Sequence, residues 1–243
     1  MIKYLGSKKK LLENIHGVIA SFNEVTSVGD LFSGTSRVGH FLKSNGYRVE
    51  ANDHNTFAST LATCYVQADQ EDWQADAERL VEELNDLPGV PGYFTETFCE
   101  SARYFQPKNG ERIDAIRERI ETLDLHPELR AIMLVSLMEA ADRVDSTTGI
   151  QMAYLKSWAP RAYNDLQLRV PALLPASKHG KSKATQLEAR EAVDLMEVDL
   201  MYLDPPYNQH SYLANYHVWE SLVLWDKPEV YGIANKRMDV RER

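Results

Sequence analysis

Short apolar runs and one amphipathic segment alternate in the first part of the chain. Residues 25–32 predict a short buried strand, and residues 37–44 carry apolar side chains at helical spacing. Asn45-Gly46 ends that helix, and residues 47–51 predict a second strand. A strand, a helix and a strand in so few residues require a right-handed crossover, so we expect the two strands to be parallel.

The middle of the chain has helical patterns instead of strands. Amphipathic spacing predicts helices around residues 80–84 and 113–123. Residues 129–141 are more apolar and predict a buried helix. Residues 156–183 contain three prolines and a basic tract, which predict a loop.

Strand patterns return at residues 185–187 and 198–203. The second of these is almost continuously apolar, as expected of a strand buried on both faces. The whole pattern predicts an α/β fold with a doubly wound, mainly parallel sheet and a helical insertion. We expect residues 1–68 and 184–243 to form the sheet domain and residues 69–183 the insertion.

Charge changes this picture because it is distributed unevenly. The chain has a net charge of −9, which is unusual for a protein that binds nucleic acid. Residues 69–128 hold six basic and sixteen acidic side chains, a net charge of −10, whereas residues 143–183 hold seven basic and two acidic ones, a net charge of +5. Phosphate contacts depend on the local field, so the basic stretch is a candidate DNA-binding surface and the acidic stretch should face away. Two solvated surfaces explain the pattern equally well.

Cysteine, histidine and apolar patterns argue against several other classes. Cys64 and Cys99 form no disulfide framework and suit a reducing compartment. The histidines are scattered and match no zinc motif, so we expect no metal site. The chain has no apolar run of the ~20 residues that span a bilayer and no signal-peptide pattern at its start. These features predict a cytoplasmic protein without membrane contacts.

The first candidate site is a glycine-containing turn after the first predicted strand. Residues 30–39, Asp-Leu-Phe-Ser-Gly-Thr-Ser-Arg-Val-Gly, place backbone N–H groups and a helix N-terminus at the carboxyl edge of the sheet. The spacing of Gly34 and Gly39 matches neither a Walker A loop nor G-x-G-x-x-G. Asp53, after the second strand, is placed to accept hydrogen bonds from a ribose. A structural turn glycine and a turn or N-cap aspartate are the alternatives.

The second candidate site is the turn Asp204-Pro205-Pro206-Tyr207, directly after the apolar run. Its prolines fix their own φ angles and stiffen the turn. The turn offers the Asp204 carboxylate, the Pro205 carbonyl and the Tyr207 ring. An aromatic amine is a poor nucleophile, and acceptors for both of its protons return electron density to nitrogen. The turn therefore indicates amine chemistry on an aromatic base, with a rigid loop and a surface aspartate as the alternative.

These residues together resemble the D12-class, Dam-like adenine-specific DNA methyltransferases. The opening Ile2-Lys3-Tyr4-Leu5-Gly6-Ser7-Lys8 is similar to the N-terminal cofactor motif of that family. Residues 30–39 resemble its methyl-donor loop, with Ser36 where the family usually has a second glycine. Asp53 matches the acidic ribose-binding position, and Asp204 to Tyr207 match the D-P-P-Y catalytic motif.

The resemblance implies a Rossmann-like methyltransferase sheet and a site-specific enzyme, of the kind found in restriction-modification systems. The methyl group would pass from S-adenosylmethionine, without a metal, to N6 of an adenine flipped out of double-stranded DNA. The implied catalytic residues are Asp204, Pro205, Pro206 and Tyr207. The implied cofactor contacts are Lys3, Tyr4, Gly6, Asp30, Phe32, Ser33, Gly34, Thr35, Asp53 and Glu188, the last of which is equally well explained as an ordinary exposed glutamate. The implied DNA contacts, in the insertion, are Arg143, Lys156, Lys178, Lys181 and Lys183.

Two other functions fit the same motifs. A methyltransferase acting on cytosine N4 uses the same amine chemistry, and a truncated, non-catalytic DNA-binding relic keeps the turn without a working site.

The family normally continues with further strands after the helix expected here at residues 211–225. We therefore expect the 198–203 strand to lie at an exposed apolar edge that promotes aggregation or weak activity, and a downstream segment or second chain to complete the fold.

Overall fold

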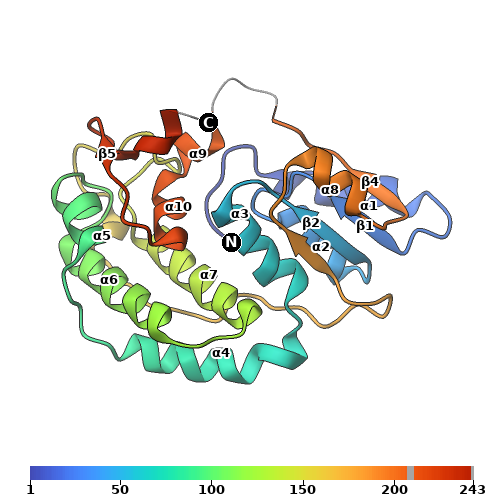
Figure 1. Ribbon diagram of the computed structural model, residues 1–243, viewed down its shortest axis with the longest axis horizontal. Helices are drawn as coiled ribbons and strands as arrows, with labels where there is room; N and C mark the ends of the chain where they lie inside the picture. Colours follow the sequence, from blue (N-terminus) through green and yellow to red (C-terminus); the bar gives the residue numbers. More distant parts are fainter. Residues whose placement is uncertain (207–210, 242–243) are drawn as a thin grey trace.

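The computed structural model describes residues 1–206 and 211–241, in which a sheet with its helices lies beside a helical part (Figure 1). In the view of Figure 1 the sheet is on the right, helices α4 to α7 are on the left, and α3 lies between them. The elements in chain order are η1 (Lys8–Lys10), α1 (Leu12–Ala20), β1 (Ser27–Asp30), α2 (Arg37–Ser44), β2 (Arg48–Asn52), α3 (Thr56–Ala62), η2 (Thr63–Gln67), α4 (Gln70–Asn85), α5 (Tyr93–Thr95), η3 (Glu96–Glu100), α6 (Pro107–Thr122), α7 (Pro127–Val144), η4 (Pro160–Tyr163), β3 (Lys183–Thr185), α8 (Ala189–Leu195), β4 (Leu200–Tyr202), α9 (Tyr212–Asn215), α10 (His217–Leu224), β5 (Val230–Tyr231), β6 (Lys236–Arg237) and η5 (Met238–Arg241).

Four parallel strands form the main sheet in the order β3-β2-β1-β4. Val28 of the central strand β1 pairs with Val49 of β2 on one side and with Leu200 of β4 on the other. All four residues of β1 are buried. Because the strands run in one direction, the segments that follow them meet at the carboxyl edge of the sheet. The predicted parallel α/β fold is confirmed.

The two later strands differ from their predictions. The third strand is Lys183–Thr185 and ends earlier than expected, because Leu187 N–H donates to the Asn52 side chain (3.0 Å) and not to a neighbouring strand. β4 is only three residues long, half-buried and at the edge of the sheet, so the prediction of a strand buried on both faces is wrong. Leu195 before it and Leu203 after it are 65% and 58% exposed.

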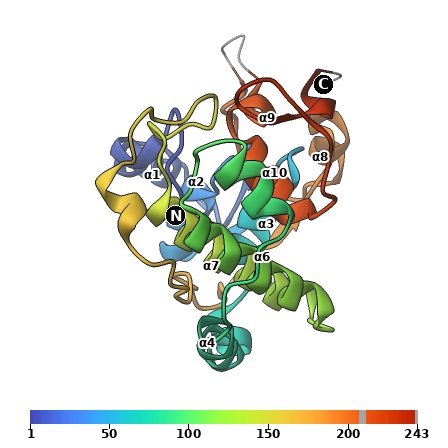
Figure 2. The same ribbon diagram turned by 90° about the vertical axis from the view of Figure 1, so that its left-hand side faces the viewer.

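Two hydrophobic cores hold the chain together. The smaller one joins the sheet to α1 and α2, through residues such as Ile19, Val28 and Leu42. The larger one joins α3 and α4 to α7 with α10, whose Trp219 and Leu222 are buried in it. Figure 2 shows this part end on, with α6 and α7 in front and α4 beneath them. The larger core therefore crosses the predicted boundaries of the insertion.

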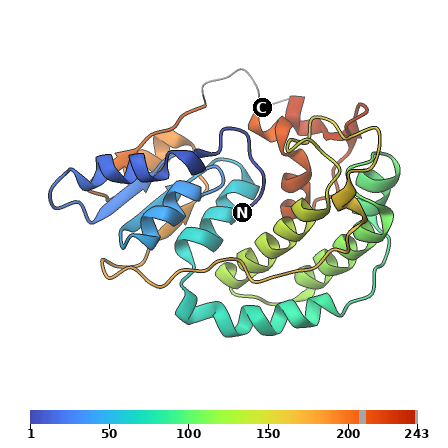
Figure 3. The same ribbon diagram turned by 180° about the vertical axis from the view of Figure 1, so that it is seen from behind.

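Helix α7 is largely buried, with 13 of its 18 residues inside the larger core or its surroundings. This agrees with the buried helix predicted over residues 129–141. Pro127 occupies the first turn, where a missing N–H costs nothing, and the His126 side chain accepts a hydrogen bond from Glu128 N–H (3.3 Å). The Met1 amino group bonds to Glu139 of α7, so the N-terminus lies between the two parts of the molecule (Figure 3).

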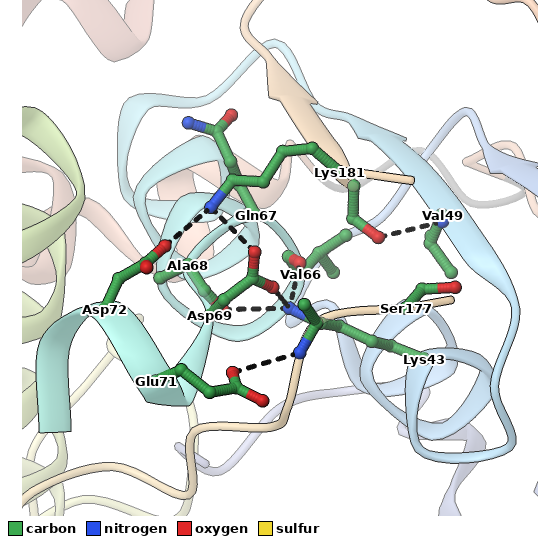
Figure 4. A network of polar contacts seen from close by, with 12 residues as sticks. Lys43, Val49, Val66, Gln67, Ala68, Asp69, Glu71, Asp72, Ser177 and Lys181 are labelled. Carbon is green, nitrogen blue, oxygen red and sulfur yellow. Dashed lines mark hydrogen bonds and ion pairs between the residues drawn. The ribbon is translucent and has the colours of Figure 1, made fainter. Parts of the chain in front are cut away.

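Both chain crossings between the sheet and the insertion meet at one polar cluster (Figure 4). The buried Lys43 Nζ donates to the carbonyls of Val66 (2.8 Å) and Ala68 (2.9 Å) and to Asp69 Oδ1 (2.7 Å). Lys181 Nζ donates to Asp69 Oδ2 (2.9 Å) and Glu128 Oε2 (3.2 Å). We call Lys43, Asp69, Glu128 and Lys181 the junction cluster. It lies at the amino edge of the sheet, where Lys43 belongs to the last turn of α2 and Lys181 precedes β3.

Candidate active site

A pocket of about 360 Å³ opens at the carboxyl edge of the sheet. Its walls come from the N-terminal segment, the loops after all four strands, and α9. The fold thus brings together motifs that lie up to two hundred residues apart in the sequence. The pocket is lined by Tyr4, Gly6, Asp30, Phe32, Ser33, Gly34, Thr35, Asp53, Glu188, Asp204 and Pro206 among the predicted site residues, and by Lys8, Arg37, His54 and Tyr212 among others.

Asp53 fixes the glycine turn from the neighbouring strand. Its Oδ2 accepts a hydrogen bond from Gly34 N–H (2.9 Å), and its Oδ1 accepts one from Asn55 N–H (3.0 Å). Gly34 has a φ of +52°, and a side chain there would meet the Tyr4 hydroxyl at 3.3 Å, so glycine is favoured. Burial raises the pKa of Asp53, whereas these hydrogen bonds lower it. Asp53 is a turn residue that also lines the pocket; the N-cap position of α3 belongs to Asn55.

Several polar atoms around this turn are buried without a partner in the described part of the chain. They include Asp30 Oδ2, Ser33 Oγ and Ser36 Oγ. The pKa of Asp30 is raised to about 7, chiefly by burial and also by the nearby carboxylates of Asp53 and Asp204, although a hydrogen bond from the Gly39 backbone lowers it. Ser36 adopts a φ of +56°, the left-handed conformation that glycine favours, and its side chain does not cap α2. Buried polar atoms without partners are typical of a binding site seen without its ligand.

Asp204 forms an ion pair with Lys8, whose Nζ lies 2.7 Å from Asp204 Oδ2. The two side chains are 29% and 19% exposed. Lys8 belongs to the N-terminal motif, and the short helix η1 points it toward the catalytic turn. Of the other predicted catalytic residues, Pro206 lines the pocket, Pro205 is exposed beside it, and Tyr207 lies outside the described residues.

A stack of three tyrosines forms one wall. The Tyr4 ring lies nearly parallel to those of Tyr216 and Tyr212, with centroids 4.7 and 5.6 Å away. The Tyr216 hydroxyl accepts a hydrogen bond from Leu5 N–H (2.6 Å). Burial raises the pKa of the Tyr4 phenol. The N-terminal motif is thereby fixed to the segment that follows the catalytic turn.

The buried Glu220 of α10 supports the pocket from behind. Its carboxylate accepts hydrogen bonds from the N–H groups of Thr56 (3.2 Å) and Phe57 (2.8 Å), at the start of α3. It therefore acts as the cap that the Asn55 side chain does not provide. Because α3 begins directly after Asp53 and Asn55, Glu220 links α10 to the loop that lines the pocket.

Two of the predicted cofactor contacts lie differently from the rest. Lys3 is not part of the pocket: its Nζ pairs with Asp145 Oδ1 (2.9 Å), and its N–H donates to Asp142 Oδ2 (3.1 Å). The prediction that Lys3 contacts the cofactor is therefore not supported by its position. Glu188 lines the pocket, but its side chain is 70% exposed and lies 3.5 Å from His54.

The predicted DNA contacts fall into two groups. Lys178, Lys181 and Lys183 precede or begin β3, so they lie at the amino edge of the sheet, opposite the pocket. Lys181 pairs with Asp69, Asp72 and Glu128 of the acidic stretch. Part of the acidic stretch therefore contacts the basic tract, because these charges attract each other across the junction. That the acidic stretch faces away from the DNA stays a prediction.

The other group is Arg143 and Lys156, which are not among the residues that line the pocket. Lys156 is exposed, and its carbonyl accepts a hydrogen bond from Arg103 (2.6 Å), which lies over the Trp158 ring. Arg143 donates to the carbonyl of Gln167 (2.7 Å). The buried Gln151 joins this region to α10, because its side-chain oxygen accepts from Val218 N–H (2.9 Å) and its own N–H donates to Asn215 O (2.8 Å).

Lys8, Tyr216, Glu220 and Gln151 were not predicted as site residues. Lys8 was visible in the opening motif, but the others act through contacts with distant segments. No group of three or more histidine, cysteine, aspartate or glutamate side chains in residues 1–206 and 211–241 is arranged to hold a metal ion. Within the same residues, none of the helices has the length and apolar character to cross a bilayer.

Comparison with known proteins agrees with the geometry of the pocket. The family described as D12 class N6 adenine-specific DNA methyltransferase matches residues 4–240. The type II methyltransferase M.NlaIII of Neisseria lactamica is 33% identical over 93% of this chain and 70% of its own length. The type II methyltransferase M.FokI of Planomicrobium okeanokoites is 31% identical over the whole chain, and the modification methylase StsI of Streptococcus sanguinis 29% over 96% of it. The chain spans only 40% and 38% of the length of these two relatives.

Proposed function

The chain belongs to the D12 class of N6 adenine-specific DNA methyltransferases, and on that premise we propose that the pocket at the carboxyl edge is its methyl-transfer site. The observation that carries the proposal is that one cavity contains the Gly34 turn, Asp53 and Asp204. These residues come from three different strand ends, and each matches a different motif of the family. The adenine specificity of the family favours N6 over cytosine N4 as the acceptor.

The residues of the pocket fit S-adenosylmethionine. This donor carries a positive sulfonium and ammonium, a negative carboxylate, and ribose hydroxyls. Asp30 offers a buried carboxylate oxygen without a partner, which suits a positive group. Asp53 lies at the loop edge, where a carboxylate can accept hydrogen bonds from a ribose. The left-handed backbone at Gly34 and Ser36 lets a ligand approach the main chain closely.

In the proposed reaction, S-adenosylmethionine would supply an activated methyl group. The N6 lone pair would form the new N–C bond, the electrons of the broken S–C bond would stay on sulfur, and N6 would pass one proton to water. Asp204 and the Pro205 carbonyl accept hydrogen bonds from the amine and hold its lone pair toward the methyl group. Lys8 orients the Asp204 carboxylate through their ion pair. The rate enhancement then comes from positioning and local electrostatics. The stacking role of Tyr207 remains a prediction.

We propose double-stranded DNA as the partner, with the target adenine flipped into the pocket. The region around Lys156 and Arg103 is the better candidate for the DNA surface, because Gln151 attaches it to α9 and α10 beside the pocket. Arg143 is a weaker candidate, since it already bonds to Gln167. We do not place Lys178, Lys181 and Lys183 on the DNA, because they lie at the other edge of the sheet.

The outer edge of β4 is a second proposed contact. In the described residues β4 pairs with β1 alone, and exposed Leu195 and Leu203 flank it. An open edge beside apolar side chains favours pairing with another strand. We propose that such a strand, from a downstream segment or a second chain, binds there and limits aggregation.

Product analysis tests the proposed function. The chain is incubated with methyl-labelled S-adenosylmethionine and unmethylated DNA, and the nucleosides are separated by mass. We expect label in N6-methyladenine. Label in N4-methylcytosine would contradict the adenine assignment, and donor binding without any methylated base would favour the non-catalytic relic.

A further inference from the structure

Arg37 is a charged residue that lines the pocket, and it is not among the predicted cofactor, catalytic or DNA contacts. It is the first residue of α2 and lies within the proposed donor loop, residues 30–39. Its Nε atom is buried and has no hydrogen-bond partner in the described residues. A guanidinium N–H removed from water without an acceptor is costly, so the position calls for an acceptor from outside the chain.

The acidic groups of α7 and Asp145 near the N-terminal segment are already engaged. Burial lowers the pKa of the Met1 amino group, and the Arg37 charge lowers it further, which places the two cations close together. Glu139, the carboxylate at this place, accepts from the Met1 amino group and from the Tyr65 hydroxyl. Asp142 and Asp145 bond to Lys3. In the described residues none of these carboxylates is a partner of Arg37, whose Nε atom is buried without an acceptor. Its guanidinium is therefore available to an anionic ligand.

The charges of the pocket are divided in a way that matches the donor. Asp30, Asp53 and Asp204 supply negative charge, and Lys8 is already paired with Asp204. Arg37, by contrast, is a basic lining residue whose buried Nε donor has no partner in the described part of the chain. The donor has two positive groups and one negative group, its amino-acid carboxylate. Arginine is the side chain best suited to a carboxylate, because its planar fork donates two parallel hydrogen bonds.

We infer that Arg37 binds the amino-acid carboxylate of the donor; this inference rests on the proposed function of the pocket. Arg37 would thereby recognise the intact amino-acid portion, while the Gly34 turn and Asp53 recognise the nucleoside. A DNA phosphate is another anion that Arg37 could bind. The experiment distinguishes it from the donor carboxylate.

The test compares two ligands that differ in the amino-acid portion. S-adenosylhomocysteine has the carboxylate, whereas 5′-methylthioadenosine has the same nucleoside and sulfur without the amino acid. Calorimetry measures both affinities, and a fluorescence titration measures the affinity for double-stranded DNA. The proteins are the wild-type chain, Arg37→Gln, Arg37→Lys and, as a matched control, Arg190→Gln on the exposed surface of α8. Thermal unfolding without ligand checks that each variant is folded.

We expect Arg37→Gln to bind S-adenosylhomocysteine about 10- to 100-fold more weakly, the loss of a charged hydrogen bond, with an unchanged affinity for 5′-methylthioadenosine. Arg37→Lys should recover part of the loss. The control Arg190→Gln should bind both ligands as the wild-type chain does. Equal losses for both ligands, or none for either, would overturn the inference, as would weaker DNA binding with unchanged S-adenosylhomocysteine affinity. A wild-type chain that binds neither ligand would instead refute the proposed function together with it.

Discussion

The two ends of the parallel sheet carry charged clusters of similar composition in opposite states. At the amino edge, the junction cluster pairs Lys43 and Lys181 with Asp69 and Glu128 at 2.7–3.2 Å. At the carboxyl edge, Asp30 and Arg37 line the pocket, and each has a buried atom without a partner in the described chain.

The difference separates a structural cluster from a binding site. A fully satisfied polar network makes the structure rigid, and it costs stability when one member is removed. Polar groups that the fold leaves unsatisfied reduce stability and are explained by a ligand. Substitutions at the two ends should therefore affect stability and binding in opposite ways.

The largest effect is expected at the catalytic turn. Asp204→Ala should lower the rate of methyl transfer by about 10²–10³-fold, because the amine loses an acceptor that acts in the transition state. Donor affinity should change little, since Asp204 faces the acceptor. Single-turnover transfer of labelled methyl groups and calorimetry on the same preparation measure the two quantities. A rate near that of the wild type would show that Asp204 has no catalytic role.

At the junction, Asp69→Asn should lower the free energy of unfolding by about 3–5 kcal/mol, because it leaves the buried Lys43 ammonium without its counter-charge. In the pocket, Asp30→Asn should maintain or increase stability at pH 8 while it weakens donor binding. Urea unfolding of both variants makes the comparison. Equal losses of stability would mean that the two ends of the sheet do not differ as described.

Asp53→Ala should weaken donor binding by about 1.5–3 kcal/mol, the value of a hydrogen bond to a charged acceptor. Part of this effect comes from the Gly34 turn, which loses its bond to Asp53. Calorimetry gives the affinity, and circular dichroism shows whether the fold is intact. An unchanged affinity in a folded variant would leave Asp53 with its turn role alone.

The raised pKa of Asp30, about 7, predicts a pH dependence with a definite sign. The folded state holds this proton more tightly than the unfolded state, so the contribution of Asp30 to stability falls as the pH rises from about 4 to 7. A positive ligand favours the ionised carboxylate, so donor binding should strengthen through pH 7 and release a proton. Calorimetry in buffers of different ionisation enthalpy measures the release. Asp30→Asn should abolish it; a release that persists in this variant would assign it to another group.

The smallest effect is expected for the basic tract. Replacing Lys178 and Lys183 together by alanine should leave the salt dependence of DNA binding almost unchanged, whereas Lys156→Ala should reduce its slope by about one. Fluorescence titrations at several salt concentrations test both. The reverse result would place the DNA at the amino edge of the sheet.

The sequence predicted what local patterns determine. Helical spacing gave α2 and α7, and the residues after β1, β2 and β4 were correctly expected at one edge, because parallel strands require it. Contacts between distant segments were not predictable. Lys3 and Lys8 share one motif, but only tertiary packing directs Lys8 to Asp204 and Lys3 to Asp145. Likewise, nothing local to Lys181 indicates Asp69 as its partner 112 positions away.

The central claim is that the pocket at the carboxyl edge binds the methyl donor. Photochemical crosslinking of labelled S-adenosylmethionine to the wild-type chain, followed by peptide mapping, tests it most directly. We predict that the label lies in the peptides that contain Tyr4, Gly34 or Asp53 and that unlabelled donor competes it away. Competable label in the tract at residues 176–183, at the opposite edge of the sheet, would contradict the account.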